Sequence, residues 1–278
     1  MPVGNIEVLA CYFVSSSMHL RFLMLLLFAY SLPGIAQHRL PFFDNTTSPY
    51  AVSWKADAFL APIGAGFISA AFIVDRHKPH ALFGTYRQQD IWRPDRGFVR
   101  SINHRAAAAS DVFMFTSLGA PALLLIDKMI RRDKSFYIMW AEVMVLNAGF
   151  TQLTKALVDR PRPYAYATNS NPQTVTGKEP LRSFFSGHTS YTAASLFFIA
   201  KVYHDYHPHS PWRHVLWVNA AVTPAVTGFL RVRAGKHFPT DVAVGYVVGA
   251  ATGILVPYVH QKIKQRQNRQ INEPVEGF

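Results

Sequence analysis

Six apolar segments of 15 to 18 residues dominate the sequence after residue 57. Their length and their content of Ala, Leu and Gly are typical of helices, and no alternating pattern bounded by turn residues predicts strands. The sequence therefore predicts an all-α protein, a bundle of about six helices. The segments are residues 58–74, 112–126, 136–153, 189–203, 215–230 and 242–259.

The same segments predict that the bundle crosses a membrane. A membrane-spanning helix needs about 20 apolar residues, and the last segment has 18 without a charge. Its small residues, such as Gly245 and Gly249, suit close helix packing in lipid. Glu142 interrupts the third segment and other segments are shorter, so a soluble helical bundle stays open as the alternative.

Basic residues predict the orientation, because cytoplasmic loops carry an excess of Lys and Arg. Three basic stretches fall on one side of the predicted membrane, which we interpret as cytoplasmic. Residues 154–188 and 231–241 then face the periplasm of a bacterial cell. The basic stretch 76–108 disagrees with this arrangement, so whether residues 58–74 cross the membrane is left open. The cytoplasmic stretches contain Lys128, Arg131, Arg132 and Lys134, then Lys201 and Arg213, then Lys262, Lys264, Arg266 and Arg269.

The N-terminal residues 1–37 are predicted to be a signal peptide or a membrane anchor. Arg21 precedes an apolar run, and the small residues Gly34 and Ala36 suit cleavage before Gln37. Neither repeats nor a Ser/Gly linker divide the rest. We expect an extension with one apolar helix over 38–110, a core over 111–260, and a basic tail over 261–278.

The charge balance and the cysteine content narrow the function classes. The formal charge of +12 suits a phosphorylated or anionic partner. The aromatic residues lie in apolar runs rather than along a basic stripe, which argues against nucleic acid as a partner. Cys11 is the single cysteine, which excludes an intrachain disulfide and a cysteine metal site.

A first polar cluster ends the third apolar segment. Lys155 and Arg162 are seven residues apart, two helical turns, so they can share one face. Cations at the end of an apolar helix need an anionic partner. That partner is either Asp159 nearby in the sequence or a bound phosphate, for which Arg offers a planar fork and Lys a point charge.

A second cluster, Ser186-Gly187-His188, opens the fourth segment. Ser is a favoured helix N-cap and Gly lets backbone approach a ligand closely. Free N–H groups at a helix start bind anions, which places His188 beside such an anion. The alternative is an ordinary capped helix with an incidental His.

A third cluster precedes the last segment. His237 and Asp241 are four residues apart, the spacing of neighbours on one helix face, and Arg231 adds a cation. A carboxylate bonded to one ring nitrogen fixes the tautomer and makes the other nitrogen a better nucleophile. The alternative is a basic loop ending in an Asp that the helix dipole favours.

Taken in order, the three clusters resemble the type 2 phosphatidic acid phosphatase superfamily, whose relatives include class A acid phosphatases and vanadium haloperoxidases. The resemblance covers roughly residues 110–260. Two positions depart from the family's pattern: Phe185 replaces its Pro and Leu230 replaces its Ser. The loss of that Ser removes one phosphate hydrogen bond, but neither change affects the ionisable residues.

The resemblance implies a role for each residue of the clusters. His237 would be the nucleophile that forms a phosphohistidine, oriented by Asp241, and His188 would protonate the leaving group. It implies no metal and no other cofactor, because fixed cations and a helix N-terminus can stabilise the transferring phosphoryl group. The phosphate-binding residues would be Lys155, Arg162, Ser186, Gly187 and Arg231.

The expected function is therefore a phosphatase in the bacterial cell membrane, with its active site at the periplasmic helix ends. Its substrate would be a membrane lipid phosphate or diphosphate of the polyprenyl, lipid A or phosphatidic acid type. Two alternatives stay open from the sequence. One is a soluble, periplasmic class A-type acid phosphatase, and the other is a vanadate-dependent haloperoxidase.

Overall fold

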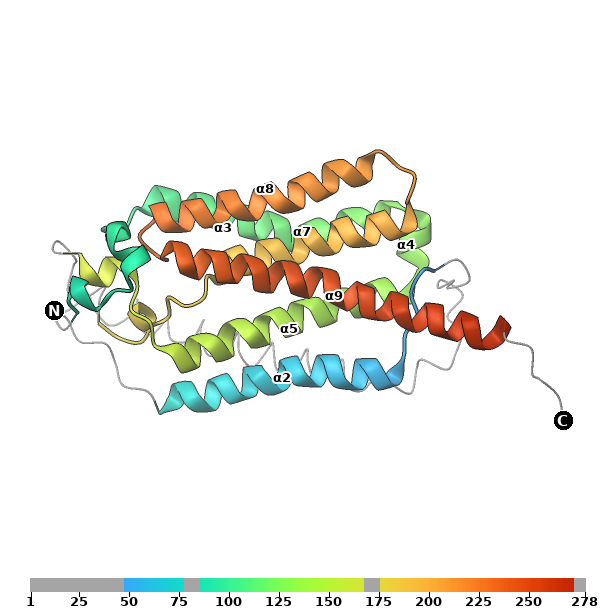
Figure 1. Ribbon diagram of the computed structural model, residues 1–278, viewed down its shortest axis with the longest axis horizontal. Coiled ribbons are helices and arrows are strands. Elements are labelled where there is room, and N and C mark those ends of the chain that lie inside the picture. The colour runs from blue at the N-terminus through green and yellow to red at the C-terminus, as the bar shows by residue number, and fades with distance from the viewer. Residues whose placement is uncertain (1–47, 78–85, 168–175, 273–278) are drawn as a thin grey trace, which may run out of the picture. The chain divides into compact units, whose positions relative to one another are not determined.

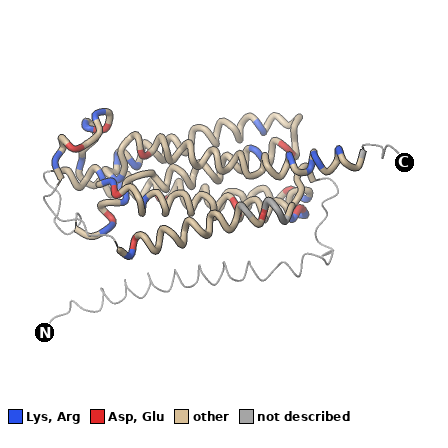
Figure 2. Tube along the Cα trace, turned by 60° about the horizontal axis from the view of Figure 1, so that its bottom comes forward, with Lys and Arg blue, Asp and Glu red and all other residues tan. Residues whose placement is uncertain are grey.

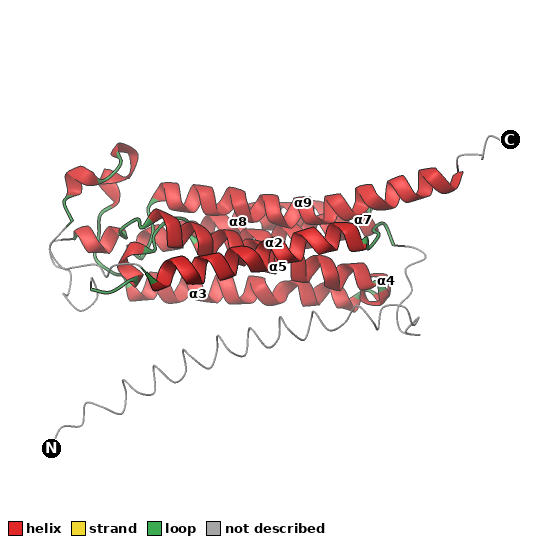
Figure 3. Ribbon diagram, turned by 90° about the horizontal axis from the view of Figure 1, so that it is seen from below, coloured by secondary structure: helices red, strands yellow, loops and turns green. Residues whose placement is uncertain are grey.

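The computed structural model describes residues 48–77, 86–167 and 176–272, and within these ranges it is a bundle of helices without strands (Figures 1 and 3). This confirms the predicted all-α class. The long helices are α2 (Trp54–Arg76), α3 (His104–Gly119), α5 (Lys134–Val158), α7 (Gly187–Tyr206), α8 (Trp212–Arg233) and α9 (Pro239–Asn272). Short helices connect them: η1 (Gln88–Asp90), η2 (Arg93–Phe98), η3 (Ala120–Ile126), α4 (Lys128–Arg132), η4 (Pro163–Tyr166) and η5 (Glu179–Leu181).

Local sequence sets several helix ends. The Asp133 carboxylate accepts a hydrogen bond from the backbone N–H of Ser135 and caps α5. The Ser186 side chain caps α7 in the same way through the N–H of Thr189. Helix α5 ends where Asp159 adopts the left-handed conformation, with φ of 47°, and Pro161 follows. These residues place the ends of α5 and α7 where the polar clusters lie.

Helix α9 packs closely on the buried helix α7. A Cβ atom at Gly245 would lie 2.5 Å from the Ser186 carbonyl oxygen, and one at Gly249 would lie 2.1 Å from that of Ser190. Only glycine permits this approach. The bundle core includes Phe136 and Phe198, fully buried, with ring centroids 5.6 Å apart.

Three helical stretches of the described residues are long and apolar enough to cross a membrane: His104–Ile126, Trp212–Arg233 and Pro239–Ile271. They expose large apolar side chains to the outside, whereas Lys, Arg, Asp and Glu gather toward the two ends of the bundle (Figure 2). This pattern is the one that lipid imposes, and it confirms a membrane protein. The exposed side chains include Phe115, Leu123, Val218, Val222, Phe229, Val247 and Leu255.

The two ends of the bundle are called here the site end, where the predicted site residues lie, and the far end. At the site end, α5 and α8 finish and α7 and α9 begin; at the far end, α4 connects to the start of α5. Helix α2 starts at the far end, where Ala51 N–H donates to the His260 carbonyl, and finishes at the site end, where Arg182 pairs with Asp75. The basic stretch 76–108 therefore connects two helix ends that lie at the site end.

Two helices have a boundary far from that of their apolar segments. Helix α3 begins eight residues before Val112, and α9 continues 13 residues past Val259, so the basic residues Lys262 to Arg269 lie on a helix. An apolar pattern identifies only the apolar part of a helix, so it misses end residues that are charged or polar. Residues 1–37 lie outside the described residues, so the leader stays a prediction.

Candidate active site

His237 lies in the short connection between α8 and α9, and its side chain is 1% exposed. Its Nδ1–H donates a hydrogen bond of 2.7 Å to the backbone carbonyl of Ser183. This bond fixes the tautomer, because a ring nitrogen that donates leaves the lone pair on Nε2. The imidazole is therefore held in the form that a nucleophile needs.

Asp241 does not hydrogen-bond directly to His237, contrary to the expectation from their spacing. Its Oδ2 lies 3.7 Å from His237 Nδ1 and accepts hydrogen bonds from the Ser183 hydroxyl at 2.6 Å and from the Phe238 N–H at 2.8 Å. Asp241 thus holds Ser183, and the Ser183 carbonyl holds the imidazole. The orienting role is exerted through an intermediate residue.

Arg160 links this carboxylate to a residue of the N-terminal extension, a connection that the sequence analysis missed. Its guanidinium pairs with Asp241 through Nη1, and through Nη2 with Asp95 at 2.6 Å. Asp95 is fully buried and also accepts a hydrogen bond of 2.5 Å from the Thr240 hydroxyl. The short helix η2 is thereby fastened to the start of α9, next to His237.

Two of the predicted phosphate ligands, Lys155 and Arg231, have charged groups without a full set of partners. The ammonium of Lys155 lies beside the start of α7, 3.5 Å from where a Cβ of Gly187 would be. Within the described residues it donates no hydrogen bond. The Arg231 guanidinium donates to Ser110 at 3.2 Å, while its buried Nε has no partner there. Buried donors in this state favour an anion.

Arg162 is buried, with a side chain 4% exposed, but it is paired with Glu179 rather than with Asp159. It also donates to the backbone carbonyls of Glu179 at 3.0 Å and of Lys236 at 3.2 Å. These bonds fix the guanidinium at the site end. The sequence analysis named Asp159 as the alternative to a bound phosphate. The carboxylate that pairs with Arg162 in the structure belongs to Glu179, the first residue of η5.

His188 lies in the first turn of α7 and has a carboxylate partner that the sequence analysis did not identify. Its Nε2–H donates a hydrogen bond of 2.7 Å to Asp111 on α3, and the same carboxylate oxygen lies 3.5 Å from Arg231 Nη1. Asp111 is a single charged residue within an apolar stretch, so no spacing pattern points to it. It connects two of the predicted site residues.

The electrostatics of the site follow from burial and from the surrounding cations. Burial, followed by the charges of Arg162, Arg231 and Lys155, holds the pKa of His237 well below its usual range. Burial and the Arg162 charge lower the pKa of Lys155 to about 7. Burial and Arg231 lower the pKa of His188 to about 4, while Asp111 acts in the opposite direction. All three pKa values are lowered first by burial and then by the neighbouring cations, so the site is both buried and positively charged.

The sequence-predicted residues therefore come together at one end of the bundle. The charges of Lys155, Arg162, Arg231 and His188 all act on His237. Ser186 is buried at the N-cap of α7, and Gly187 follows it. A buried neutral imidazole among cations and a helix N-terminus can bind an anion and attack its central atom. A separate pocket of about 530 Å³ opens beside Arg160 and Phe238, and the predicted site residues do not line it.

The fold is a helical membrane bundle, and its predicted site residues gather positive charge around a buried imidazole. Residues 136–265 match the family model of the PAP2 superfamily. A crystal structure of a transmembrane PAP2 type phosphatidylglycerolphosphate phosphatase from Bacillus subtilis aligns at 20% identity over 76% of this chain and 96% of that chain, with a TM-score of 0.42.

Over residues 136–265, which are 130 of the 278 residues, the chain is similar to the PAP2 superfamily, and this match supports a phosphatase, a hydrolase of phosphoric esters. The matched segment spans α5, α7 and α8 and most of α9, so it contains every residue of the three sequence clusters. Asp95 and Asp111 lie before it, and they contact the matched segment only through tertiary structure.

Proposed function

We propose that the protein hydrolyses a membrane lipid phosphate or diphosphate through a phosphohistidine on His237. The observation that carries this proposal is the buried imidazole whose Nδ1–H is held by the Ser183 carbonyl. Its other nitrogen keeps a lone pair and is surrounded by the charges of Lys155, Arg162 and Arg231. A neutral nucleophile in a field that attracts phosphate is what phosphoryl transfer requires.

The reaction proceeds in two displacements at phosphorus. The Nε2 lone pair of His237 forms a bond to phosphorus while the bond to the leaving oxygen breaks. His188, which Asp111 and the bound phosphate must keep protonated against burial and the Arg231 charge, gives that oxygen its proton. Water then attacks the phosphohistidine, its proton passes to His188, and the N–P bond breaks. Inorganic phosphate leaves and both imidazoles return to their starting states. Asp241 keeps His237 in position through Ser183.

The cations hold the phosphoryl oxygens during both displacements. Lys155 and the Arg231 Nε supply donors that are not engaged with protein groups in the described residues. The α7 start adds the Ser186 hydroxyl and the N–H of Gly187. These groups stabilise the charge that develops on the equatorial oxygens without rearranging, which is the largest contribution such sites make.

The lipid nature of the substrate rests on where the site lies. Asp111, in contact with His188, is followed on α3 by the exposed apolar residues Val112, Phe113 and Phe115. On α8, the exposed Phe229 lies two residues before Arg231. A phosphate headgroup can reach the cations while its chains stay along these apolar helix faces.

The orientation follows from the basic residues of the far end. Lys128, Arg131 and Arg132 on α4, together with Lys262 and Lys264 on α9, lie away from the site. An excess of Lys and Arg indicates the cytoplasmic side, which favours an active site that faces the periplasm of a bacterial cell. The basic stretch 76–108 at the site end argues in the opposite direction, so the orientation needs a direct test. A cysteine introduced at exposed Arg105 is then labelled by a membrane-impermeant thiol reagent in intact spheroplasts.

The test is phosphate release by the purified protein in detergent from a panel of substrates. The panel contains phosphatidic acid, a polyprenyl diphosphate, lipid A phosphate and the soluble p-nitrophenyl phosphate. We expect at least one lipid to exceed the soluble ester about 100-fold in kcat/KM, and an acid-labile, alkali-stable phosphoenzyme in rapid-quench samples. Preference for the soluble ester would refute the lipid assignment, and a phosphoenzyme retained by the His237→Asn variant would refute the nucleophile.

A further inference from the structure

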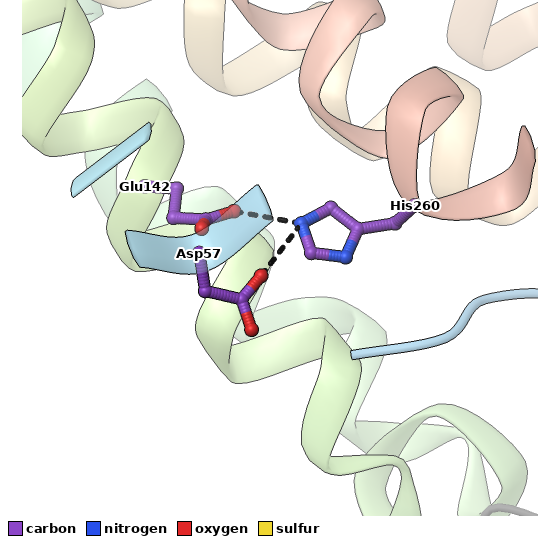
Figure 4. Close-up of side chains that lie close together, drawn as sticks. All are labelled: Asp57, Glu142 and His260. Atoms are coloured by element: carbon purple, nitrogen blue, oxygen red, sulfur yellow. Dashed lines mark hydrogen bonds and ion pairs between the residues drawn. The ribbon is translucent and has the colours of Figure 1, made fainter. Parts of the chain in front are cut away.

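A second polar cluster lies within the bundle, far from the active site. It consists of Asp57 on α2, Glu142 on α5 and His260 on α9 (Figure 4). His260 Nε2 lies 2.8 Å from a Glu142 carboxylate oxygen and 3.7 Å from one of Asp57. One ligand atom from each residue lies within 4.8 Å of the other two. Three helices thus bring three potential metal ligands to one point.

The His260 ring is oriented by a backbone carbonyl. Its Nδ1–H donates a hydrogen bond of 2.9 Å to the carbonyl of Ala51, and the ring is fully buried. This bond fixes the tautomer and directs the Nε2 lone pair at the two carboxylates (Figure 4). Metal-binding histidines are typically held in this manner by a second hydrogen bond.

The charges of the cluster are not balanced by protein groups. Within the described residues, Asp57 and Glu142 form ion pairs with His260 alone and with no Lys or Arg. Oδ1 of Asp57 and Oε1 of Glu142 are buried without a hydrogen-bond partner, and the Glu142 side chain is only 3% exposed. Two buried carboxylates facing one imidazole are unfavourable unless a positive charge joins them.

We propose that Asp57, Glu142 and His260 bind a divalent cation of the Zn²⁺ or Mn²⁺ type, which joins helices α2, α5 and α9. One imidazole and two carboxylates form a donor set that these ions accept. Bonds of about 2.0–2.2 Å to each ligand require the Glu142 oxygen to move away from His260 Nε2, from which it now lies 2.8 Å. Asp57, with a side chain 21% exposed, provides the route for entry.

This site is distinct from the catalytic one. His260 follows Asp241 on α9 by 19 residues, about 28 Å of helix at 1.5 Å per residue. The sequence analysis expected no metal, because the resemblance implies a phosphatase that works without one. Asp57, Glu142 and His260 lie far apart in the chain and share no spacing motif that could have indicated a metal site. The cation would stabilise the far end of the bundle and take no part in phosphoryl transfer.

The experiment measures cation binding to the purified full-length protein in detergent after treatment with a chelator. Calorimetric titration with Zn²⁺ is expected to give one site per chain, and Co²⁺ a visible absorption band. Zn²⁺ at about 100 times its Kd is expected to raise the unfolding midpoint by about 5–10 °C. Glu142→Gln and Asp57→Asn are each expected to weaken binding at least about 100-fold, because each removes a ligand.

His207→Ala is the matched control. His207 is also paired with a carboxylate, Asp127 at 2.6 Å, and belongs to a group with His204 and His209 that offers the competing ligands. Its variant is expected to keep the site, and phosphatase activity of all variants reports that they are folded. Absence of Zn²⁺ and Co²⁺ binding, or binding unchanged in Glu142→Gln and Asp57→Asn, would overturn the proposal. A cluster held by a shared proton would give that result.

Discussion

Two buried histidines, one just before helix α9 and one within it, are oriented by the same kind of hydrogen bond but lie among opposite charges. His237 precedes the helix and His260 lies 23 positions further along the chain, and both rings are almost inaccessible to solvent. Each donates its Nδ1–H to a backbone carbonyl, that of Ser183 or that of Ala51. In both cases the hydrogen bond reserves Nε2 for another partner.

The surroundings of Nε2 decide what that partner is. Around His237 the charges are Lys155, Arg162 and Arg231, which favour an incoming phosphate. Around His260 they are two carboxylates, which favour a proton or a cation. A fixed tautomer is therefore not evidence of catalysis by itself. The sign of the surrounding charge distinguishes a nucleophile from a ligand.

The largest expected effect separates the two histidines directly. His237→Asn is expected to lower kcat at least about 10⁴-fold, because the variant lacks the group that we propose forms the covalent intermediate. His260→Asn, the control further along α9, is expected to retain turnover within about tenfold below its unfolding midpoint. The measurement is phosphate release at matched folded fractions. Comparable losses in both variants would mean that burial, not charge, sets the role.

A smaller effect concerns the carboxylate at the catalytic end. Asp111 raises the pKa of His188 against burial and the Arg231 charge, so Asp111→Asn is expected to reduce the protonated fraction of His188. An alkyl phosphate, whose leaving oxygen needs that proton, is expected to lose about 10- to 100-fold in kcat/KM. For p-nitrophenyl phosphate, whose leaving group departs unprotonated, we expect a loss of less than about threefold.

The control for this variant is Asp127→Asn, which removes the carboxylate of the equivalent His207 pair away from the active site. It is expected to affect neither substrate. A loss of the same size for both substrates in Asp111→Asn would instead assign Asp111 a structural role in fixing α3 against Arg231.

The sequence analysis anticipated the helices and the residues at the catalytic end, but not how they are connected. Apolar segments located the helices because lipid and core both select apolar residues. The ordered spacing from Lys155 to Asp241 located the clusters. By contrast, Asp95, Asp111 and Arg160 act through tertiary contacts with partners that lie 65 or more positions away. A single polar residue carries no spacing signal, so only the fold could find these contacts.

The hydrogen bond that the sequence analysis expected between Asp241 and His237 is absent, which again shows that sequence spacing does not determine tertiary contacts. Their separation of four residues placed them on one helical face, but His237 precedes α9, whose first residue is Pro239. The ring instead reaches the Ser183 carbonyl, and Asp241 supports that segment through the Ser183 hydroxyl. Spacing rules assume a continuous helix, and here the helix begins between the two residues.

The smallest expected effect is a shift in pH dependence at the catalytic end. The pKa of Lys155 is lowered to about 7 by burial and by Arg162, so its ammonium is present below pH 7 and lost as the pH rises above it. Phosphate binding is then weakened, and kcat/KM of the native protein is expected to fall above about pH 7. Lys155→Arg keeps its charge throughout this range, so the fall is expected to move upward by at least about one pH unit.

Lys236→Arg tests whether the effect belongs to Lys155. The pKa of Lys236 is also lowered, by burial and by Arg162, but its ammonium lies over the Tyr164 ring at 5.1 Å. This control is expected to leave the fall of kcat/KM where it is in the native protein. The substrate's own phosphate titrates near pH 6 in all three proteins, so it cancels from the comparison. If the profile moves with Lys236 instead, Lys155 is not the cation that makes the catalytic end selective for phosphate.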